Sequence, residues 1–249
     1  MNLRIQFALP FMVLSSVLTC TNSQLRIVNG NSANIEDSPY MVSIRYFRCN
    51  HCAGSLVTEQ IVVTAAHCLK GYKSIFITVV VGVTDRRETG QRRKVQKKLY
   101  PPSFNSKTLY MDIGVIKVRK PFTLSPTVNT IPLCSTPVTP GTQMRVSGWG
   151  STSEKNWKPT YILQTTDVSI IPQLVCVDRY KITEEAMICA RGDGTDTCYG
   201  DSGTGGVVNG QLCAVLTGAY GCARALYPSR YSDINNEKVQ SFLIESMKP

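Results

Sequence analysis

From residue 39 onward the sequence alternates between short apolar runs and polar turns. The runs are rich in β-branched residues and lie at 41–47, 61–63, 75–83, 113–118, 144–146, 168–171 and 207–216. Apolar runs of this length, bounded by glycine, proline and polar residues, predict β-strands. Helical spacing occurs only near the end, on a face made of Val239, Phe242, Leu243 and Met247. Many short strands and one terminal helix, which Ser232 or Asp233 could cap, predict an all-β domain closed into barrels or stacked as a sandwich.

The first twenty residues have a different pattern. Arg4 precedes an apolar run at 7–18, and small or polar residues follow it. This order is typical of a secretory signal peptide, and the run is shorter than the roughly 20 apolar residues of a membrane span. We therefore expect residues 1–22 to be a signal peptide with an approximate end, and a secreted, extracellular protein without a membrane anchor.

Secretion decides how the ten cysteines are interpreted. In an oxidising compartment cysteines are disulfide partners first and metal ligands second. A zinc site is the alternative, because Cys49 and Cys52 have zinc-like spacing and His67 precedes Cys68. Removal of Cys20 with the signal peptide leaves nine cysteines, so one thiol is unpaired, pairs with another chain, or pairs with a retained Cys20.

The chain has 249 residues, 43% of them hydrophobic, and a formal charge of +10. The charge is densest at 86–98, where Glu88 is the only acid among Arg86, Arg87, Arg92, Arg93, Lys94, Lys97 and Lys98. This run is either a solvated loop or an exosite for an acidic ligand, such as a sulfated glycan or an acidic protein segment. No nucleic-acid-binding motif accompanies the charge, so we expect no nucleic-acid partner.

Candidate chemistry is concentrated at 196–203, around Ser202. Gly200 and Gly203 flank this serine closely, which suits a tight turn rather than a regular strand or helix. Backbone N–H groups that converge beside a nucleophile are what acyl transfer requires, because its tetrahedral intermediate carries an oxyanion. Serine alone is a weak nucleophile, so this interpretation requires a base and an orienting carboxylate elsewhere. The alternative is a glycine-rich surface turn.

The candidates for base and carboxylate are few. His51 and His67 are the two histidines, and His67 follows the apolar run 61–63 directly. Its imidazole can accept a hydroxyl proton near neutral pH. Asp112 precedes the apolar run 113–118 and is therefore expected to be drawn inward, where a histidine N–H would satisfy it.

Four motifs now share one chain: Arg26-Ile27-Val28-Asn29-Gly30, Thr64-Ala65-Ala66-His67-Cys68, Ser147-Gly148-Trp149-Gly150 and Gly200-Asp201-Ser202-Gly203. Together with the order His67, Asp112, Ser202, they resemble the trypsin/chymotrypsin family of serine proteases, in its trypsin-like subgroup. The resemblance runs from Arg26 to the C-terminus. It implies two packed six-stranded antiparallel β-barrels with a C-terminal α-helix, in a protease domain at 27–249.

The resemblance also implies roles for these residues. Ser202 would attack the scissile carbonyl, His67 would act as base and then acid, and Asp112 would orient the imidazole. The N–H groups of Gly200 and Ser202 would form the oxyanion hole. The resemblance therefore implies that the substrates are proteins or peptides.

Activation is implied by the first motif. Cleavage after Arg26 would free the amine of Ile27, which would enter the protein and pair with Asp201. Residues 23–26 would then be a short activation propeptide, and the uncut chain a zymogen awaiting an activating protease or its own activity.

The expected specificity pocket combines familiar and unusual residues. Asp196, with Thr197 beside it, stands where family members that cleave after Arg or Lys have their pocket-floor carboxylate. Ala219 and Ser229 replace glycines of trypsins, and Gly218 replaces a tryptophan. We expect cleavage after Arg or Lys in a pocket that these side chains narrow or shorten.

The resemblance also implies disulfide pairings, which are Cys52–Cys68, Cys176–Cys189 and Cys198–Cys222. Cys134 and Cys213 are left in the same half of the chain, and we infer that they pair. Cys49 is the odd cysteine. Val83 replaces the first acidic residue of the family's calcium loop, so we expect no metal and no cofactor.

Two functions compete. The first is a secreted serine endopeptidase, with substrates, an activating protease and protease inhibitors as partners. The second is a catalytically weak homologue that acts as a binding protein through the basic 86–98 loop or its altered cleft.

Overall fold

A computed structural model describes residues 30–151, 160–181, 186–194, 196–198, 200–222, 224 and 226–248. The expected signal peptide at 1–22, the propeptide at 23–26 and the Arg26–Ile27 bond lie outside the described residues. No helix within the described ranges is long and apolar enough to cross a membrane.

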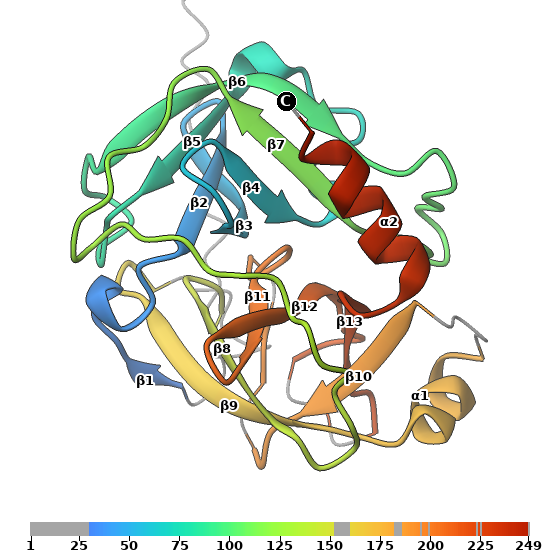
Figure 1. Cartoon of the computed structure of the whole chain (residues 1–249). Helices are drawn as coiled ribbons and strands as arrows, with labels where there is room; N and C mark the ends of the chain where they lie inside the picture. The colour runs from blue at the N-terminus through green and yellow to red at the C-terminus, as the bar shows by residue number, and fades with distance from the viewer. Residues whose placement is uncertain are drawn as a thin grey trace, which may run out of the picture.

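Six antiparallel strands close the first barrel, drawn in blue to green in Figure 1. They are β2 (Met41–Tyr46), β3 (Cys49–Leu56), β4 (Ile61–Thr64), β5 (Ile77–Val81), β6 (Gln91–Leu99) and β7 (Gly114–Val118). Around the barrel they pair in the order β2-β3-β4-β7-β6-β5. Short 3-10 helices lie between them, at Ala66–Cys68 after β4 and at Ser74–Phe76 before β5, and another at Ile35–Asp37 precedes the barrel.

A second ring of six strands closes in the other half, drawn in yellow to orange. Its members are β8 (Gln143–Gly148), β9 (Gln164–Ile170), β10 (Met187–Arg191), β11 (Gly205–Val208), β12 (Gln211–Gly218) and β13 (Ser229–Asp233). They pair in the order β8-β9-β10-β13-β12-β11, and β11 returns to β8. The short strand β1 (Asn31–Ser32) adds to β9. The prediction of two six-stranded antiparallel barrels is therefore confirmed.

The C-terminal helix α2 (Glu237–Ser246) begins later than the sequence suggested. Its N-cap is Asn236, whose side chain accepts a hydrogen bond from the backbone N–H of Lys238. The predicted caps, Ser232 and Asp233, are wrong because both belong to β13. Figure 1 shows α2 packed along the first barrel, although it follows the last strand of the second.

A second helix was not expected. Helix α1 (Gln173–Tyr180) is eight residues long, and Cys176 is its only fully buried residue. Leu174 is 81% exposed. Because its apolar residues do not form a buried face, hydrophobic periodicity could not indicate this helix.

Four disulfides lie within the described residues: Cys52–Cys68, Cys134–Cys213, Cys176–Cys189 and Cys198–Cys222. They are the same pairings that the resemblance and the inference from it gave. The zinc alternative is wrong here: Cys52, His67 and Cys68 do come together, but both of these sulfurs are bonded to each other. Cys49 is also disulfide-bonded rather than free, and its candidate partner Cys20 lies outside the described residues.

The two barrels meet where the loop that carries Ser202 packs on β3 and β4. The backbone N–H of Ala53 donates to the carbonyl of Ser202 at 2.8 Å. Gly203 has a φ of +83°, and a Cβ there would lie 2.2 Å from Thr64 Oγ1 and 2.5 Å from the carbonyl of Ala53. Only glycine fits such a conformation and such a space. The glycine after the serine therefore sets how closely the second barrel approaches the first.

Candidate active site

His67 and Asp112 form the best defined part of the site. His67 lies in the short 3-10 helix after β4, and Asp112 lies two residues before β7. Asp112 is fully buried and accepts two hydrogen bonds from His67, from Nδ1 to Oδ2 at 2.7 Å and from the backbone N–H to Oδ1 at 2.8 Å. Both carboxylate oxygens are thus used to fix one residue, ring and backbone together.

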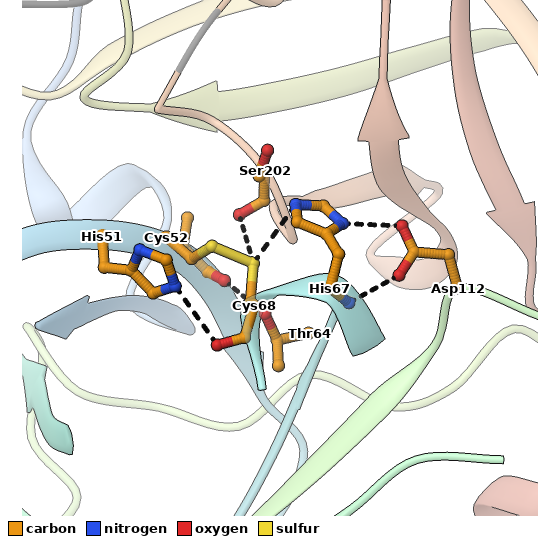
Figure 2. The surroundings of a disulfide bond; sticks show 8 residues. His51, Cys52, Thr64, His67, Cys68, Asp112 and Ser202 are labelled. Carbon is orange, nitrogen blue, oxygen red and sulfur yellow. Dashed lines mark hydrogen bonds and ion pairs between the residues drawn. A yellow bond between two sulfur atoms is a disulfide. The ribbon is translucent and has the colours of Figure 1, made fainter. Parts of the chain in front are cut away.

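The outer edge of the imidazole faces the serine. Figure 2 shows the His67 ring between Asp112 and Ser202, with Nε2 on the side of Ser202. Among the contacts of the described residues, Nε2 has Cys68 Sγ at 3.6 Å, and no hydrogen bond joins it to Ser202 Oγ. Hydrogen bonds of this kind are often long before substrate binds. The arrangement leaves Nε2 available as a base.

The other histidine is placed differently. His51 Nε2 lies 3.3 Å from the carbonyl oxygen of Cys68, and its ring centroid is 4.2 Å from that of Tyr72. Burial lowers the pKa of His51, which favours its neutral form. No carboxylate among the described residues orients it, so its role is packing.

The loop before Ser202 is a sequence of tight turns. Gly200 has a φ of +94°, the Asp201 N–H donates to the carbonyl of Cys198 at 3.2 Å, and the Thr204 N–H donates to the carbonyl of Asp201 at 2.8 Å. A positive φ of this kind is accessible mainly to glycine. Gly200 is therefore required by the backbone beside the serine.

Thr204 anchors this loop from the other side. Its side chain is fully buried, and its hydroxyl donates to the carbonyl of Ser147. Gly205 and Gly206 follow it into β11, where a Cβ on Gly206 would lie 2.2 Å from Met144 Sδ. The threonine therefore ties the serine loop to β8.

Asp201 is buried without a cation among the described residues. Its Oδ1 accepts from the Gly150 N–H at 2.7 Å and its Oδ2 from the Cys198 N–H at 3.2 Å. A Cβ on Gly148 or Gly150 would lie 2.1 or 2.2 Å from the carboxylate, so these glycines make room for it. Burial raises the pKa of Asp201 to about 7, against the lowering effect of the two amides. Its expected partner Ile27 lies outside the described residues.

Asp196 is also buried, with 2% of its surface exposed. Its Oδ1 accepts hydrogen bonds from Ser229 Oγ at 2.7 Å and from the backbone N–H of Thr197 at 2.7 Å. The hydroxyls of Thr197 and Ser229 are themselves 2.9 Å apart. Burial raises the pKa of Asp196 to about 6, and the hydrogen bond from Ser229 acts in the opposite direction.

The other residues expected in the specificity pocket, Ala219 and Gly218, lie at the end of β12. Ala219 is half-buried just after β12, and Gly218 is the last residue of that strand. A cavity of about 480 Å³ reaches Asp196, and its lining also includes Arg191 and Arg224. Neither arginine belonged to the predicted site, because no motif surrounds them and only the fold of the second barrel brings them near Asp196.

The basic run requires a correction. Residues 91–99 form strand β6, so the predicted loop at 86–98 is wrong for most of its length. Arg86 and Arg87 precede the strand, where Arg87 pairs with Asp85 and lies 4.2 Å from the ring centroid of Tyr161. The charges are therefore fixed on a barrel wall.

Comparison with known proteins agrees with this geometry. The sequence matches the family model of trypsin over residues 27–241. It is similar to seminase of Drosophila melanogaster, with 34% identity over 90% of this chain and 83% of the relative. It is similar to trypsin of Sarcophaga bullata (33% identity, 90% and 89%) and to trypsin theta of Drosophila melanogaster (36% identity, 84% and 82%). The chain therefore belongs to the trypsin family of serine endopeptidases.

Proposed function

We propose that this chain is a secreted endopeptidase that cleaves peptide bonds after Arg or Lys. Residues 1–22 serve as the signal peptide, 23–26 as the propeptide and 27–249 as the protease domain. The observation that carries the proposal is the buried Asp112, which is bonded twice to His67 on the side opposite Ser202. Protein substrates follow from the family.

In this proposal Ser202 Oγ attacks the carbonyl carbon while His67 Nε2 takes its proton. Because Asp112 holds Nδ1–H, the imidazole is kept in the tautomer whose Nε2 is basic. His67 then returns the proton to the leaving amine, and Asp112 stabilises the imidazolium in between. The N–H groups of Gly200 and Ser202 receive the oxyanion, where loss of one donor typically costs about 3 kcal/mol of transition-state stabilisation.

Asp196 selects the substrate in this proposal. Ser229 and Thr197 occupy its Oδ1, and none of the described residues donates a hydrogen bond to Oδ2. We assign Oδ2 to the cationic side chain of the substrate. An apolar side chain would leave a buried carboxylate unpaired, which is strongly unfavourable.

Activation supplies the cation that Asp201 lacks. Cleavage between Arg26 and Ile27, by an activating protease or by a sister molecule, frees an amine that pairs with this carboxylate. The raised pKa of Asp201 supports the assignment, because a desolvated carboxylate favours a positive partner. The uncut chain is then a zymogen with little activity.

Two further partners belong to the proposal. Protease inhibitors would occupy the same site as substrates. An acidic glycan or acidic protein segment would bind the basic residues within 86–98, outside the site. The competing function, a weak protease that acts mainly as a binding protein, draws support from Ser229, which touches the carboxylate expected to bind substrate.

The deciding experiment uses chain processed at Ile27 and peptides that end in Arg, Lys, Phe or Ala before the reporter group. We expect turnover of the Arg and Lys peptides, labelling of Ser202 by a small acylating reagent, and a loss of kcat on the order of 10⁵ to 10⁶ in Ser202→Ala. The absence of both turnover and labelling would contradict the proposal. A biological effect retained in full by Ser202→Ala would favour the binding protein.

A further inference from the structure

A groove of about 310 Å³ lies on the wall of the first barrel, away from the Ser202 site. The described residues of its lining are five basic residues with Thr78 and Val80, and none of them is acidic. The basic residues are Arg45, Arg48, Arg92, Arg93 and Lys94. Because the described lining residues that carry a charge are all positive, this groove is suited to bind an anion.

Strand register explains why these cations converge. Arg45 on β2 is opposite Thr78 on β5, and Thr78 is opposite Lys94 on β6. In the next row, Val80 is opposite Arg92. Residues directly opposite each other in antiparallel strands share one face of the sheet. Arg45, Lys94 and Arg92 are therefore brought to one face from strands that are about fifty residues apart in sequence.

Arg45 forms a fixed floor for the groove. Only 8% of its surface is exposed. Its Nε donates to Ser43 Oγ at 3.3 Å and its Nη2 to the carbonyl of Arg86 at 2.6 Å, while none of the described residues accepts from Nη1. Burial lowers the pKa of Arg45, and neighbouring Arg92 and Arg86 lower it further. An arginine still keeps its charge, so this buried cation is held without a carboxylate from any of the described residues.

Other basic residues of the same strand region are already engaged elsewhere. Arg87 pairs with Asp85. Arg93 borders the groove, but its Nε donates to the carbonyl of Pro121 at 3.0 Å and its guanidinium lies 5.0 Å from the ring centroid of Phe122.

Two residues of the groove also have internal partners: Arg92 Nε donates to the carbonyl of Thr89 at 2.9 Å, and Lys94 Nζ donates to Thr78 Oγ1 at 3.3 Å. None of the described residues accepts a hydrogen bond from their other N–H groups, which are therefore available to an anion in the groove.

We propose that the groove binds a sulfate group of a sulfated glycan, through Arg45, Arg48, Arg92 and Lys94. This inference deepens the proposed exosite and rests on it. A guanidinium matches the oxygens of a sulfate with paired, directional N–H groups. Among the described residues of the lining, Val80 is the only apolar one, whereas a bound peptide would normally need aromatic or aliphatic anchors. The polar lining therefore favours a glycan over an acidic protein segment.

The test measures binding of a heparin hexasaccharide to the chain processed at Ile27, by calorimetry at low and at physiological salt. The groove variant combines Arg48→Gln, Arg92→Gln and Lys94→Gln. The matched control combines Arg87→Gln, Lys97→Gln and Arg119→Gln, three residues outside the groove lining, and removes the same charge from the same barrel. We expect affinity to fall at least tenfold in the groove variant and less than threefold in the control, with the difference smaller at high salt.

Three results would overturn the inference: equal losses in both variants, equal affinity for the N- and O-desulfated hexasaccharide, or tighter binding of a glutamate-rich peptide. A separate variant, Arg45→Lys, should bind the hexasaccharide more weakly, because an ammonium lacks the paired N–H geometry of a guanidinium. Thermal unfolding reports whether this variant folds. Cleavage of a small Arg peptide is measured on every sample. Turnover without groove discrimination rejects this inference alone, and groove discrimination without turnover rejects the proposed protease function alone.

Discussion

The site contains three buried carboxylates, those of Asp112, Asp196 and Asp201. They differ in whether one of the described residues supplies a side chain that can carry a positive charge. Asp112, beside the first barrel, uses both oxygens to bind His67. Asp196 and Asp201, in loops of the second barrel, receive only hydroxyl and amide hydrogen bonds from the described residues. Burial raises the pKa of Asp196 to about 6 and that of Asp201 to about 7.

This contrast separates the carboxylate whose partner is already present in the folded chain from the two whose cationic partners must be supplied later. Both members of the Asp112–His67 pair come from the first barrel, and Ser232 of β13 supports it by donating to the backbone carbonyl of Asp112 at 3.1 Å. Asp196 and Asp201 are desolvated in advance, which makes each a site that favours an incoming cation. In the proposed function these cations are the substrate side chain and the amine of Ile27. In the proposed function the first barrel therefore positions the base, and the second barrel carries the carboxylates that govern specificity and activation.

The largest expected effect comes from breaking the completed pair. Asp112→Asn should lower kcat by about four orders of magnitude, as this change does in well-studied Ser-His-Asp triads, because the amide stabilises the wrong tautomer of His67. Steady-state kinetics on the Arg peptide would measure it. His51→Gln is the control, since His51 contacts a carbonyl and no carboxylate. Similar losses in both variants would mean that His67 is not the base.

A change at the second carboxylate should affect selection rather than chemistry. Asp196→Asn should lower kcat/KM for Arg and Lys peptides by about 10³, because a neutral amide cannot pair with the cation. Labelling of Ser202 by a small acylating reagent should change only a few-fold. Asp193→Asn, on the lining of the same cavity, is the matched control. Loss of labelling together with turnover would show that Asp196 supports the fold of the loop instead.

The sequence indicates candidate residues of the site, whereas their contacts depend on the fold. Asp112 was recognisable because it directly precedes an apolar run, and Ser202 because glycines surround it. By contrast, Ser229 was visible as a departure from trypsins, but its hydrogen bond to Asp196 spans 33 positions and depends on how β13 packs. The hydroxyl of Thr204 likewise acquires a function only beside the carbonyl of Ser147.

Strand β6 shows why part of the fold was missed. Val95 is its only fully buried residue, and basic side chains occupy both faces, so no alternating pattern exists to indicate a strand. Backbone pairing with β5 and β7 holds it in the barrel instead. For the same reason the groove at Arg45 could not be predicted, because the local pattern of apolar residues does not reveal the strand register that brings its residues together.

The third carboxylate, Asp201, is expected to give the uncut chain a stability that falls as the pH rises. Since the pKa of Asp201 rises from 3.8 to about 7 on folding, the folded state holds the proton between these values and the unfolded state does not. The stabilisation is complete below pH 4 and is lost as pH rises through 7, with a total of roughly 4 kcal/mol. Urea unfolding of uncut Ser202→Ala chain at several pH values should show this slope. Adding Asp201→Asn should remove the contribution of Asp201 and leave the smaller contribution of Asp196, whose pKa is also raised, to about 6.

Two comparisons sharpen that measurement. Asp167→Asn changes an exposed carboxylate that pairs with Arg145, so it should leave the slope in place. Chain processed at Ile27 should lose the contribution of Asp201 even with that residue intact, because the freed amine stabilises the ionised carboxylate, and should keep the smaller contribution of Asp196. If processing leaves the slope unchanged, Ile27 is not the partner of Asp201.

The smallest expected effect tests whether Ser229 limits the pocket. Its hydroxyl occupies Oδ1 of Asp196 and stabilises the ionised form. Ser229→Gly should raise kcat/KM for Arg peptides about threefold to tenfold above pH 7, because Oδ1 becomes available to the substrate guanidinium. The same change should raise the pKa of Asp196, so the gain should shrink or reverse as the pH falls toward 6. Ser229→Ala removes the hydrogen bond but keeps a Cβ in the pocket, so it separates the effect of the hydrogen bond from that of the space the side chain fills. A gain equal to that of Ser229→Gly would assign the limit to the hydrogen bond. No gain in either variant would show that Ser229 does not restrict the substrate.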